Sequence, residues 1–177
     1  MSKILMFSGS SRKESFNKKL INLAAKKATE QGHEVTLIDL KEYSMLIYDG
    51  DLEEENGAPE NAKEICKLMS ESDSIVISSP EYNGFPSPLL KNVIDWVSRV
   101  DRDVYKNKRI AIISASPGGL GGVRGLMQLR MLLNNLNAAV IPQQLSVGGS
   151  SSGFDNNGNL TNENYDVILT SIIKELA

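Results

Sequence analysis

The sequence predicts an α/β protein in which a parallel β-sheet is covered by helices on both faces. Short apolar runs that are typical of buried strands alternate with longer segments of helical periodicity, and polar or glycine-rich loops separate them. Parallel strands need long right-handed crossovers between them, and helices supply those crossovers. Because no repeat and no linker divides the 177 residues, we expect a single domain spanning residues 1–177.

Five strands and five helices are expected in alternation along the chain. The strands are expected at residues 4–7, 35–38, 74–78, 109–113 and from 139 to 142, and the helices at about 14–31, 60–71, 89–100, 123–136 and 163–176. Pro142 in the last strand is typical of a sheet edge. The acidic segment 51–55 is expected to be a solvated surface loop, and the Met and Leu residues of 127–133 to form a buried helix face.

Composition and charge exclude several functional classes. Hydrophobic residues make up 41% of the chain and the net charge is −3, which favours a folded domain over disorder and over nucleic-acid binding. No apolar run is long enough to span a membrane, and the core strand close to Met1 leaves no room for a signal peptide. The single cysteine, Cys66, and the single histidine, His33, predict no disulfide, no metal site, no Cys/His catalysis and a cytoplasmic location. Demanding chemistry is then expected to belong to a cofactor.

The loop after the first strand, residues 8–17, is rich in hydroxyl groups and opens a helix. A helix N-terminus presents unpaired N–H groups and a positive dipole end, and Arg12 adds a charged donor. The P-loop pattern fails because Glu14 stands where a second glycine is needed, and the dinucleotide pattern fails at Ser11. The loop therefore predicts binding of a terminal monophosphate, while the plainer interpretation is that Ser15 only caps the helix.

The loop after the third strand, residues 79–88, holds three prolines and a glycine. Prolines fix the backbone, so the remaining N–H groups can be aimed at the edge of a planar heterocycle. Tyr82 supplies an aromatic surface, and Asn83 can both donate and accept hydrogen bonds. A rigid turn with Pro88 at the first position of the next helix explains the same composition equally well.

The loop after the fourth strand, residues 114–122, carries four glycines between a strand and a helix. The dinucleotide spacing fails here too, because Arg124 stands where its third glycine is needed. The glycines instead favour close approach of the backbone to a ring, and a flexible loop is the plainer interpretation. Downstream, Asp155, Asn157 and Asn159 imitate the start of a calcium loop, but Leu160 occupies the position of its required glycine, so a polar turn is expected.

Three sets of residues together resemble the NADPH-dependent FMN reductase family, which includes bacterial chromate and quinone reductases and several azoreductases. They are Gly-Ser-Ser-Arg at 9–12 with Ser-Phe-Asn at 15–17, Pro-Glu-Tyr-Asn-Gly at 80–84, and Leu-Lys-Asn-Val-Ile-Asp-Trp at 90–96. The similarity extends through Gly-Gly-Val-Arg at 121–124 and the segment 154–160. The resemblance implies a flavodoxin-like three-layer sandwich, with a five-stranded parallel sheet of order 2-1-3-4-5 and FMN at its carboxyl edge.

The same resemblance implies which residues hold the cofactor. By that similarity the FMN phosphate is bound by Ser10, Arg12, Ser15, Phe16 and Asn17. The isoalloxazine ring is lined by Pro80, Glu81, Tyr82, Asn83 and Gly84, mostly through backbone groups, and the site is completed by Ser116, Gly118 and Gly119. No metal ligand is expected.

The activity that the resemblance implies is an FMN-dependent oxidation of NADPH or NADH, with two electrons passed by hydride transfer to a small acceptor. The acceptor is expected to be a quinone, an azo compound, chromate or free flavin. No side chain is expected to be catalytic, because the flavin carries the chemistry. The family also implies a homodimer or homotetramer, and we expect neither a membrane nor a nucleic acid as a partner.

Two other functions compete with this one. A flavodoxin-type electron carrier would bind FMN without oxidising NAD(P)H directly, but the mild net charge and Arg12 disfavour it. A regulatory sheet protein that binds another phosphorylated ligand is the second, and a receiver domain is disfavoured because no acidic cluster follows the first strand.

Overall fold

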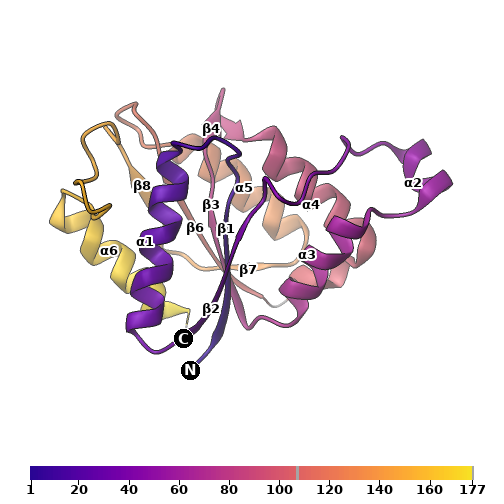
Figure 1. The fold of residues 1–177 in the computed structure, drawn as a ribbon, viewed down its shortest axis with the longest axis horizontal. Helices are drawn as coiled ribbons and strands as arrows, with labels where there is room; N and C mark the ends of the chain where they lie inside the picture. Colours follow the sequence, from indigo (N-terminus) through magenta and orange to yellow (C-terminus); the bar gives the residue numbers. More distant parts are fainter. Residues whose placement is uncertain (107, 177) are drawn as a thin grey trace.

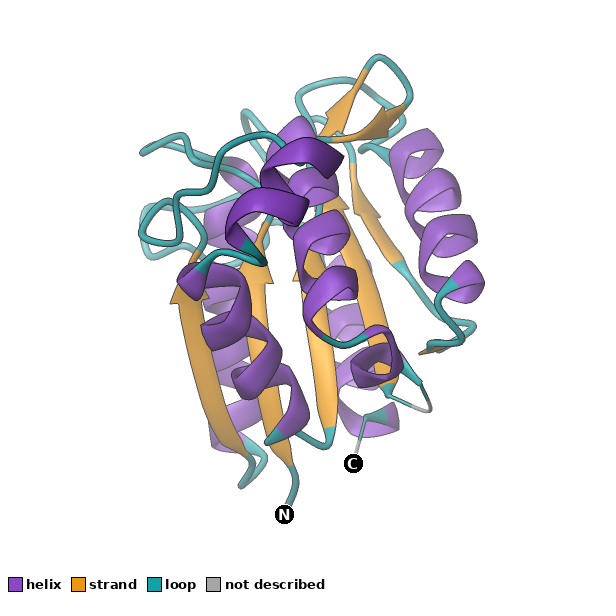
Figure 2. Cartoon of the chain, turned by 90° about the vertical axis from the view of Figure 1, so that its right-hand side faces the viewer, coloured by secondary structure: helices purple, strands orange, loops and turns teal. Residues whose placement is uncertain are grey.

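The computed structural model describes residues 1–106 and 108–176 and has three layers. A central parallel sheet lies between two groups of helices (Figures 1 and 2). Its strands are β1 (Lys3–Ser8), β2 (Glu34–Asp39), β3 (Ser74–Ser78), β6 (Arg109–Ala115), β7 (Ala139–Val140) and β8 (Leu145–Val147). Their order is β2-β1-β3-β6-β7, and β8 also pairs with β6. The predicted sheet order is therefore confirmed.

The last strand is divided into two short pieces. Both β7 and β8 pair in parallel with β6, and the segment with Pro142 lies between them. Proline has no N–H to donate to a neighbouring strand, which agrees with its place at the sheet edge.

Helices cover both faces of the sheet. The helices that cover it are α1 (Phe16–Glu30), α3 (Glu60–Ser70), α4 (Pro88–Val100), α5 (Val123–Asn135) and α6 (Glu163–Glu175). Helix α2 (Gly50–Asn56) projects away from the sheet and buries no residue (Figure 1), and a 3₁₀ helix spans Arg102–Tyr105. Alternate residues of each strand point to opposite faces. Ile4 and Met6 of β1 pack in the core under α1 and α6, whereas Leu5 and Phe7 pack in the core under α3, α4 and α5. Burial on both faces explains why these strands are continuous apolar runs.

Two sequence predictions about surfaces are wrong in part. In the acidic segment 51–55, Asp51, Glu54 and Glu55 are exposed as expected, but the segment lies in helix α2, which Asp49 caps by accepting a hydrogen bond from Asp51 N–H. Acidic residues in the first turn favour a helix because they complement its dipole. On α5, Leu129 and Leu133 are buried, but Met127 and Met131 are exposed because they project from the opposite side of the helix.

The carboxyl ends of the inner strands lie level with one another. Ser8 of β1 pairs with Ser78 of β3, and Ser78 pairs in turn with Ile113 of β6. The loops after β1, β3 and β6 therefore leave the sheet at the same edge. The loop after β3 contains a small hairpin, β4 (Glu81–Tyr82) and β5 (Phe85–Pro86).

Candidate functional site

The three loops meet in one pocket of about 100 Å³. It is lined by Ser10, Arg12, Ser15, Phe16, Asn17, Pro80, Glu81, Tyr82, Ala115, Ser116 and Pro117. Most of the residues expected from the sequence are thus brought together, whereas Asn83, Gly84, Gly118 and Gly119 do not line the pocket. Ala115 and Pro117 were missed, although both flank Ser116 in the loop 114–122 that the sequence analysis singled out.

The loop after β1 places donors at the N-terminus of α1. Ser15 is the N-cap and its hydroxyl accepts a hydrogen bond from Lys18 N–H, so Ser15 does cap the helix, while its contact with a phosphate stays a prediction. Ser10 is also buried, and its hydroxyl accepts from Arg12 N–H. The Arg12 side chain is exposed and has no ion pair within residues 1–106 and 108–176. An unpaired guanidinium beside a helix N-terminus favours an anion.

Gly9 brings this loop against α4. A Cβ atom at Gly9 would lie 2.9 Å from the Leu90 Cβ and 3.2 Å from the Ser87 hydroxyl. Ser87 caps α4 and donates its hydroxyl hydrogen to the Gly9 carbonyl. Only glycine therefore fits where the first loop packs on the helix that follows the second loop.

Asn17 joins three elements inside the protein. Its Nδ2 donates to the Ala115 carbonyl at 2.8 Å, and its Oδ1 accepts from Ala115 N–H and from the Ser78 hydroxyl, both at 3.0 Å. The side chain therefore links α1 to the carboxyl ends of β3 and β6, a role that the sequence analysis missed. Its contribution to phosphate binding stays a prediction.

Replacing Asn17 with alanine is expected to lower the free energy of unfolding by about 2–4 kcal/mol, because buried partners lose their hydrogen bonds. Chemical denaturation monitored by circular dichroism measures this loss. Asn22→Ala on the exposed side of the same helix is the control, and we expect it to cost less than about 0.5 kcal/mol. Equal losses in the two variants would contradict the structural role of Asn17.

The loop after β3 turns back on itself at Asn83 and Gly84. Both residues have positive φ values, 54° and 83°, in the two-residue turn of the β4–β5 hairpin. Asn-Gly is the preferred pair for such a turn. The turn places Asn83 and Gly84 at the hairpin tip, outside the pocket lining, while Tyr82 stays at the pocket and is 47% exposed.

The Glu81 carboxylate fixes this hairpin to α5. It accepts hydrogen bonds from Arg124 Nη2 at 2.7 Å, from Arg124 Nε at 3.0 Å and from Gly125 N–H at 3.0 Å. Gly122, the N-cap of α5, has no side chain that could accept a hydrogen bond from the first turn of this helix. The Glu81 carboxylate, which belongs to the loop after β3, accepts the bond from Gly125 N–H instead. Burial by itself would raise the pKa of Glu81, but the bonds from Gly125 and Arg124 leave that pKa below its ordinary value.

Glu81→Gln is expected to lower the free energy of unfolding by about 1–3 kcal/mol at neutral pH, because it removes the charge from these hydrogen bonds. A lowered pKa in the folded protein contributes stability above the unfolded pKa, and this contribution is lost as the pH falls through the folded pKa. The difference between the two proteins should therefore shrink in acid. Urea titrations at about pH 7 and about pH 3 measure it, and a difference that does not change with pH would contradict the assignment.

The glycine-rich loop after β6 packs closely against the loop after β8. Ser116 N–H donates to the Val147 carbonyl. A Cβ on Gly148 would overlap the carbonyl oxygen of Gly119. Gly121 has a φ of 61° and also lies against this backbone. A Cβ on Gly119 would have no atom within 4 Å, and a Cβ on Gly118 would have only the Ser116 hydroxyl, at 3.7 Å. Their predicted approach to a ring stays a prediction.

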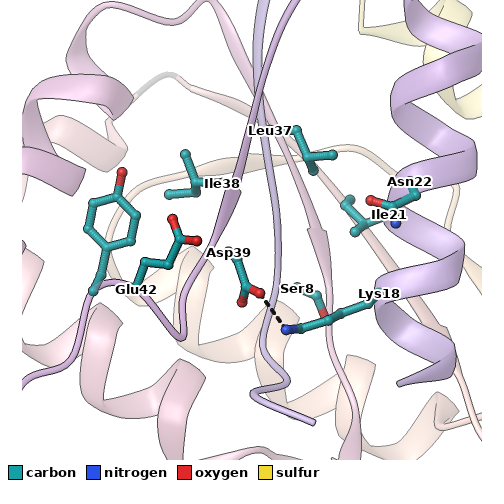
Figure 3. Close-up of a pocket in the computed structure, with 9 residues that line it drawn as sticks. Ser8, Lys18, Ile21, Asn22, Leu37, Ile38, Asp39 and Glu42 are labelled. Carbon is teal, nitrogen blue, oxygen red and sulfur yellow. Dashed lines mark hydrogen bonds and ion pairs between the residues drawn. The ribbon is translucent and has the colours of Figure 1, made fainter. Parts of the chain in front are cut away.

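A larger hollow of about 430 Å³ lies beside the edge strand β2 (Figure 3). Its lining includes Leu37 and Ile38, which are successive residues of β2 and point to opposite faces of the sheet. The hollow therefore extends around the sheet edge. Lys18, the cation that lines it, is already paired with Asp39 at 2.5 Å. The smaller pocket, where three loops converge beside an unpaired arginine, is the better candidate for an anionic cofactor.

Other kinds of site find no support in residues 1–106 and 108–176. No group of three or more His, Cys, Asp or Glu residues is arranged to hold a metal ion there. Asp155 accepts hydrogen bonds from Asn157 and Asn159 N–H, so the polar turn is confirmed. None of the helices in this part of the chain is long and apolar enough to cross a bilayer.

Comparison with known proteins shows which proteins this chain is similar to. Residues 2–152 match the family described as NADPH-dependent FMN reductase. A quinone reductase of Escherichia coli K12 is 33% identical over 141 residues, which cover 80% of this chain and 74% of the relative. An NAD(P)H:quinone oxidoreductase of Solanum tuberosum is 32% identical over 179 residues, covering 98% and 90%.

The fold is shared with a solved flavoenzyme. FerB, an NAD(P)H:(acceptor) oxidoreductase from Paracoccus denitrificans, superposes with a TM-score of 0.84 at 24% identity, covering 99% of this chain and 95% of that one. The flavodoxin-like sheet and the family match over most of the chain lead to one conclusion: this chain belongs to the NADPH-dependent FMN reductase family.

Proposed function

We propose that this protein binds FMN in the pocket formed by the loops after β1, β3 and β6, oxidises NAD(P)H and reduces a quinone. The observation that carries the proposal is the convergence of these loops at the N-terminus of α1, beside Arg12. The names of the relatives from Escherichia coli and Solanum tuberosum support a quinone as the acceptor.

The pocket residues fit the phosphate end of FMN. The hydroxyls of Ser10 and Ser15, the unpaired Arg12 and the N–H groups of the first turn of α1 would hold the phosphate. Glu81, the carboxylate in the lining, is held by Arg124 and Gly125, which limits its repulsion of an anion. Tyr82 and the backbone of the third loop would contact the ring. FMN, when bound, would accept hydride from the nicotinamide and transfer two electrons to the acceptor.

The test is a visible spectrum of the purified protein after FMN addition and desalting, followed by anaerobic NADPH. Retained flavin absorbance that bleaches with NADPH, and returns when a quinone is added, is the expected result. Retained flavin that bleaches with neither NADPH nor NADH would indicate an electron carrier instead. If no flavin is retained, the cofactor assignment is wrong.

We also propose that the chain forms a homodimer or homotetramer and works in the cytoplasm. Exposed apolar side chains beside the site support self-association: Phe85 of β5, and Met127 and Met131 of α5, a helix that contacts β5. A single cysteine, Cys66, suits a reducing compartment. Size-exclusion chromatography with light scattering measures the mass of the protein in solution. A monomer mass at all concentrations would contradict the proposed oligomer.

A further inference from the structure

A second hollow, of about 270 Å³, lies between α1 and the polar turn that follows Phe154. It is lined by Lys19, Asn22, Leu23, Lys26, Asn157, Gly158 and Asn159. Two lysines and three asparagines therefore line one space, and none of the lining residues is acidic. This composition favours an anion over a neutral ligand or a cation.

The lysines of α1 fall into two groups. Lys18 pairs with Asp39 at 2.5 Å, and Lys27 pairs with Asp166 at 2.8 Å. Lys19 and Lys26, which face the hollow, form no ion pair with any residue that the structure describes. They are seven residues apart and so lie on one side of the helix, two turns from each other. Their charges are available to a ligand.

The polar turn does not neutralise these charges by an ion pair. The Asp155 carboxylate accepts from Asn157 N–H at 2.8 Å, Asn159 N–H at 2.9 Å and Asn159 Nδ2 at 3.1 Å. Its oxygens are therefore used inside the turn. Gly158, with a φ of 80°, lets the turn close and brings its amide groups to the hollow.

Phe16 connects this hollow to the cofactor pocket. Phe16 lines the pocket, and the Lys19 ammonium lies 5.7 Å from the centre of its ring. Phe16 also stacks on Phe154, with ring centres 6.3 Å apart and an interplanar angle of 7°. The lysine hollow is thus linked to the phosphate end of the proposed FMN site through Lys19 and Phe16, although Phe16 itself does not line the hollow.

We propose that Lys19 and Lys26 bind a phosphate group, either the phosphate monoester of a second ligand or free inorganic phosphate. A phosphate monoester carries a charge between −1.5 and −2 and several strong acceptor oxygens, which suits two ammonium groups with amide donors between them. Two sources supply this group: the 2′-phosphate of NADPH, which rests on the proposed function, and free phosphate. Binding of the first kind would make the protein prefer NADPH to NADH.

The test compares the double variant Lys19→Gln/Lys26→Gln with the native protein, both mixed with FMN and desalted. The probes are adenosine 2′-phosphate, adenosine and inorganic phosphate, titrated while the amide signals of the polar turn are followed by NMR. We expect adenosine 2′-phosphate to bind and the double variant to bind it about tenfold more weakly, since two partly exposed charge contacts are lost. Lys63→Gln/Lys67→Gln on α3 removes the same charge elsewhere and should bind normally.

The outcomes separate the two sources. Tighter binding of adenosine 2′-phosphate than of inorganic phosphate, with KM for NADPH raised several-fold more than KM for NADH in the double variant, supports the coenzyme. Equal, lysine-dependent binding of the two phosphates supports a site for free phosphate. Binding that is absent, or unchanged in the double variant, overturns the site.

The spectrum of the same samples keeps this test separate from the proposed function. If flavin is retained and bleached but no probe depends on the lysines, only the anion site is wrong. If no flavin is retained but the phosphates still bind through Lys19 and Lys26, the anion site stands and the proposed function is wrong.

Discussion

Replacing Arg12 with alanine is expected to weaken FMN binding by about 10- to 100-fold, because a hydrogen bond to a charged group contributes about 1.5–3 kcal/mol. Arg12 lines the pocket at the N-terminus of α1 and has no carboxylate partner in the described part of the chain. Its charge is therefore free to meet the phosphate. Quenching of FMN fluorescence on titration of the flavin-free protein measures the dissociation constant.

Lys13→Ala is the matched control for this prediction. Lys13 is the next residue of the same exposed loop and carries the same charge, but it does not line the pocket. We expect its replacement to change the FMN dissociation constant less than threefold, about the effect of one exposed charge. Similar losses in the two variants would mean that only the general charge of the loop matters, and the assigned contact of Arg12 would be wrong.

Replacing Gly121 with alanine is expected to lower the free energy of unfolding by about 2–5 kcal/mol. The φ of 61° strains any residue with a side chain by about 1–2 kcal/mol. In addition, the new Cβ would lie 2.7 Å from the backbone of Ser146 and Gly148 and 2.8 Å from that of Val147. These are backbone atoms at the end of β8, which pairs with β6, so they cannot move aside without cost. Thermal and urea unfolding measure the loss.

Gly32→Ala separates strain from overlap. Gly32 also has a positive φ, 85°, but a Cβ there would have no atom within 4 Å. Its replacement should cost only the strain of about 1–2 kcal/mol. If both variants lose the same stability, the close contact between the loops after β6 and β8 is not what requires Gly121.

Local patterns determined much of this fold in advance. The strands at 74–78 and the helices beginning near Ser15 and Pro88 could be predicted because buried strands, N-caps and N1 prolines depend on residues close in sequence. Helix α2 was missed because its segment has no apolar face and buries no residue, so periodicity gave no signal. Met127 and Met131 misled the burial prediction, since apolar composition alone does not say which side of a helix faces the core.

The residues of the candidate site also differ in how far the sequence could predict their roles. Ser15 could be recognised from the sequence as both a helix cap and a pocket residue, because its neighbours define the end of the helix. Asn17 was assigned to the phosphate, and its bonds to Ser78 and Ala115 could not be foreseen, because those partners lie 61 and 98 residues away. Glu81 was expected at the ring, and its carboxylate is taken up by Arg124 and Gly125.

By itself, the sequence determined the α/β class, the single sheet covered on both faces and the three loops that carry the residues predicted to bind the cofactor. These follow from local periodicity, turn residues and the level carboxyl ends of parallel strands. Tertiary structure alone decided which polar side chains face the pocket, which glycines the packing requires, and which lysines of α1 remain unpaired. The physical reason is that each of these depends on a partner distant in sequence, whose position is set only when the whole chain packs.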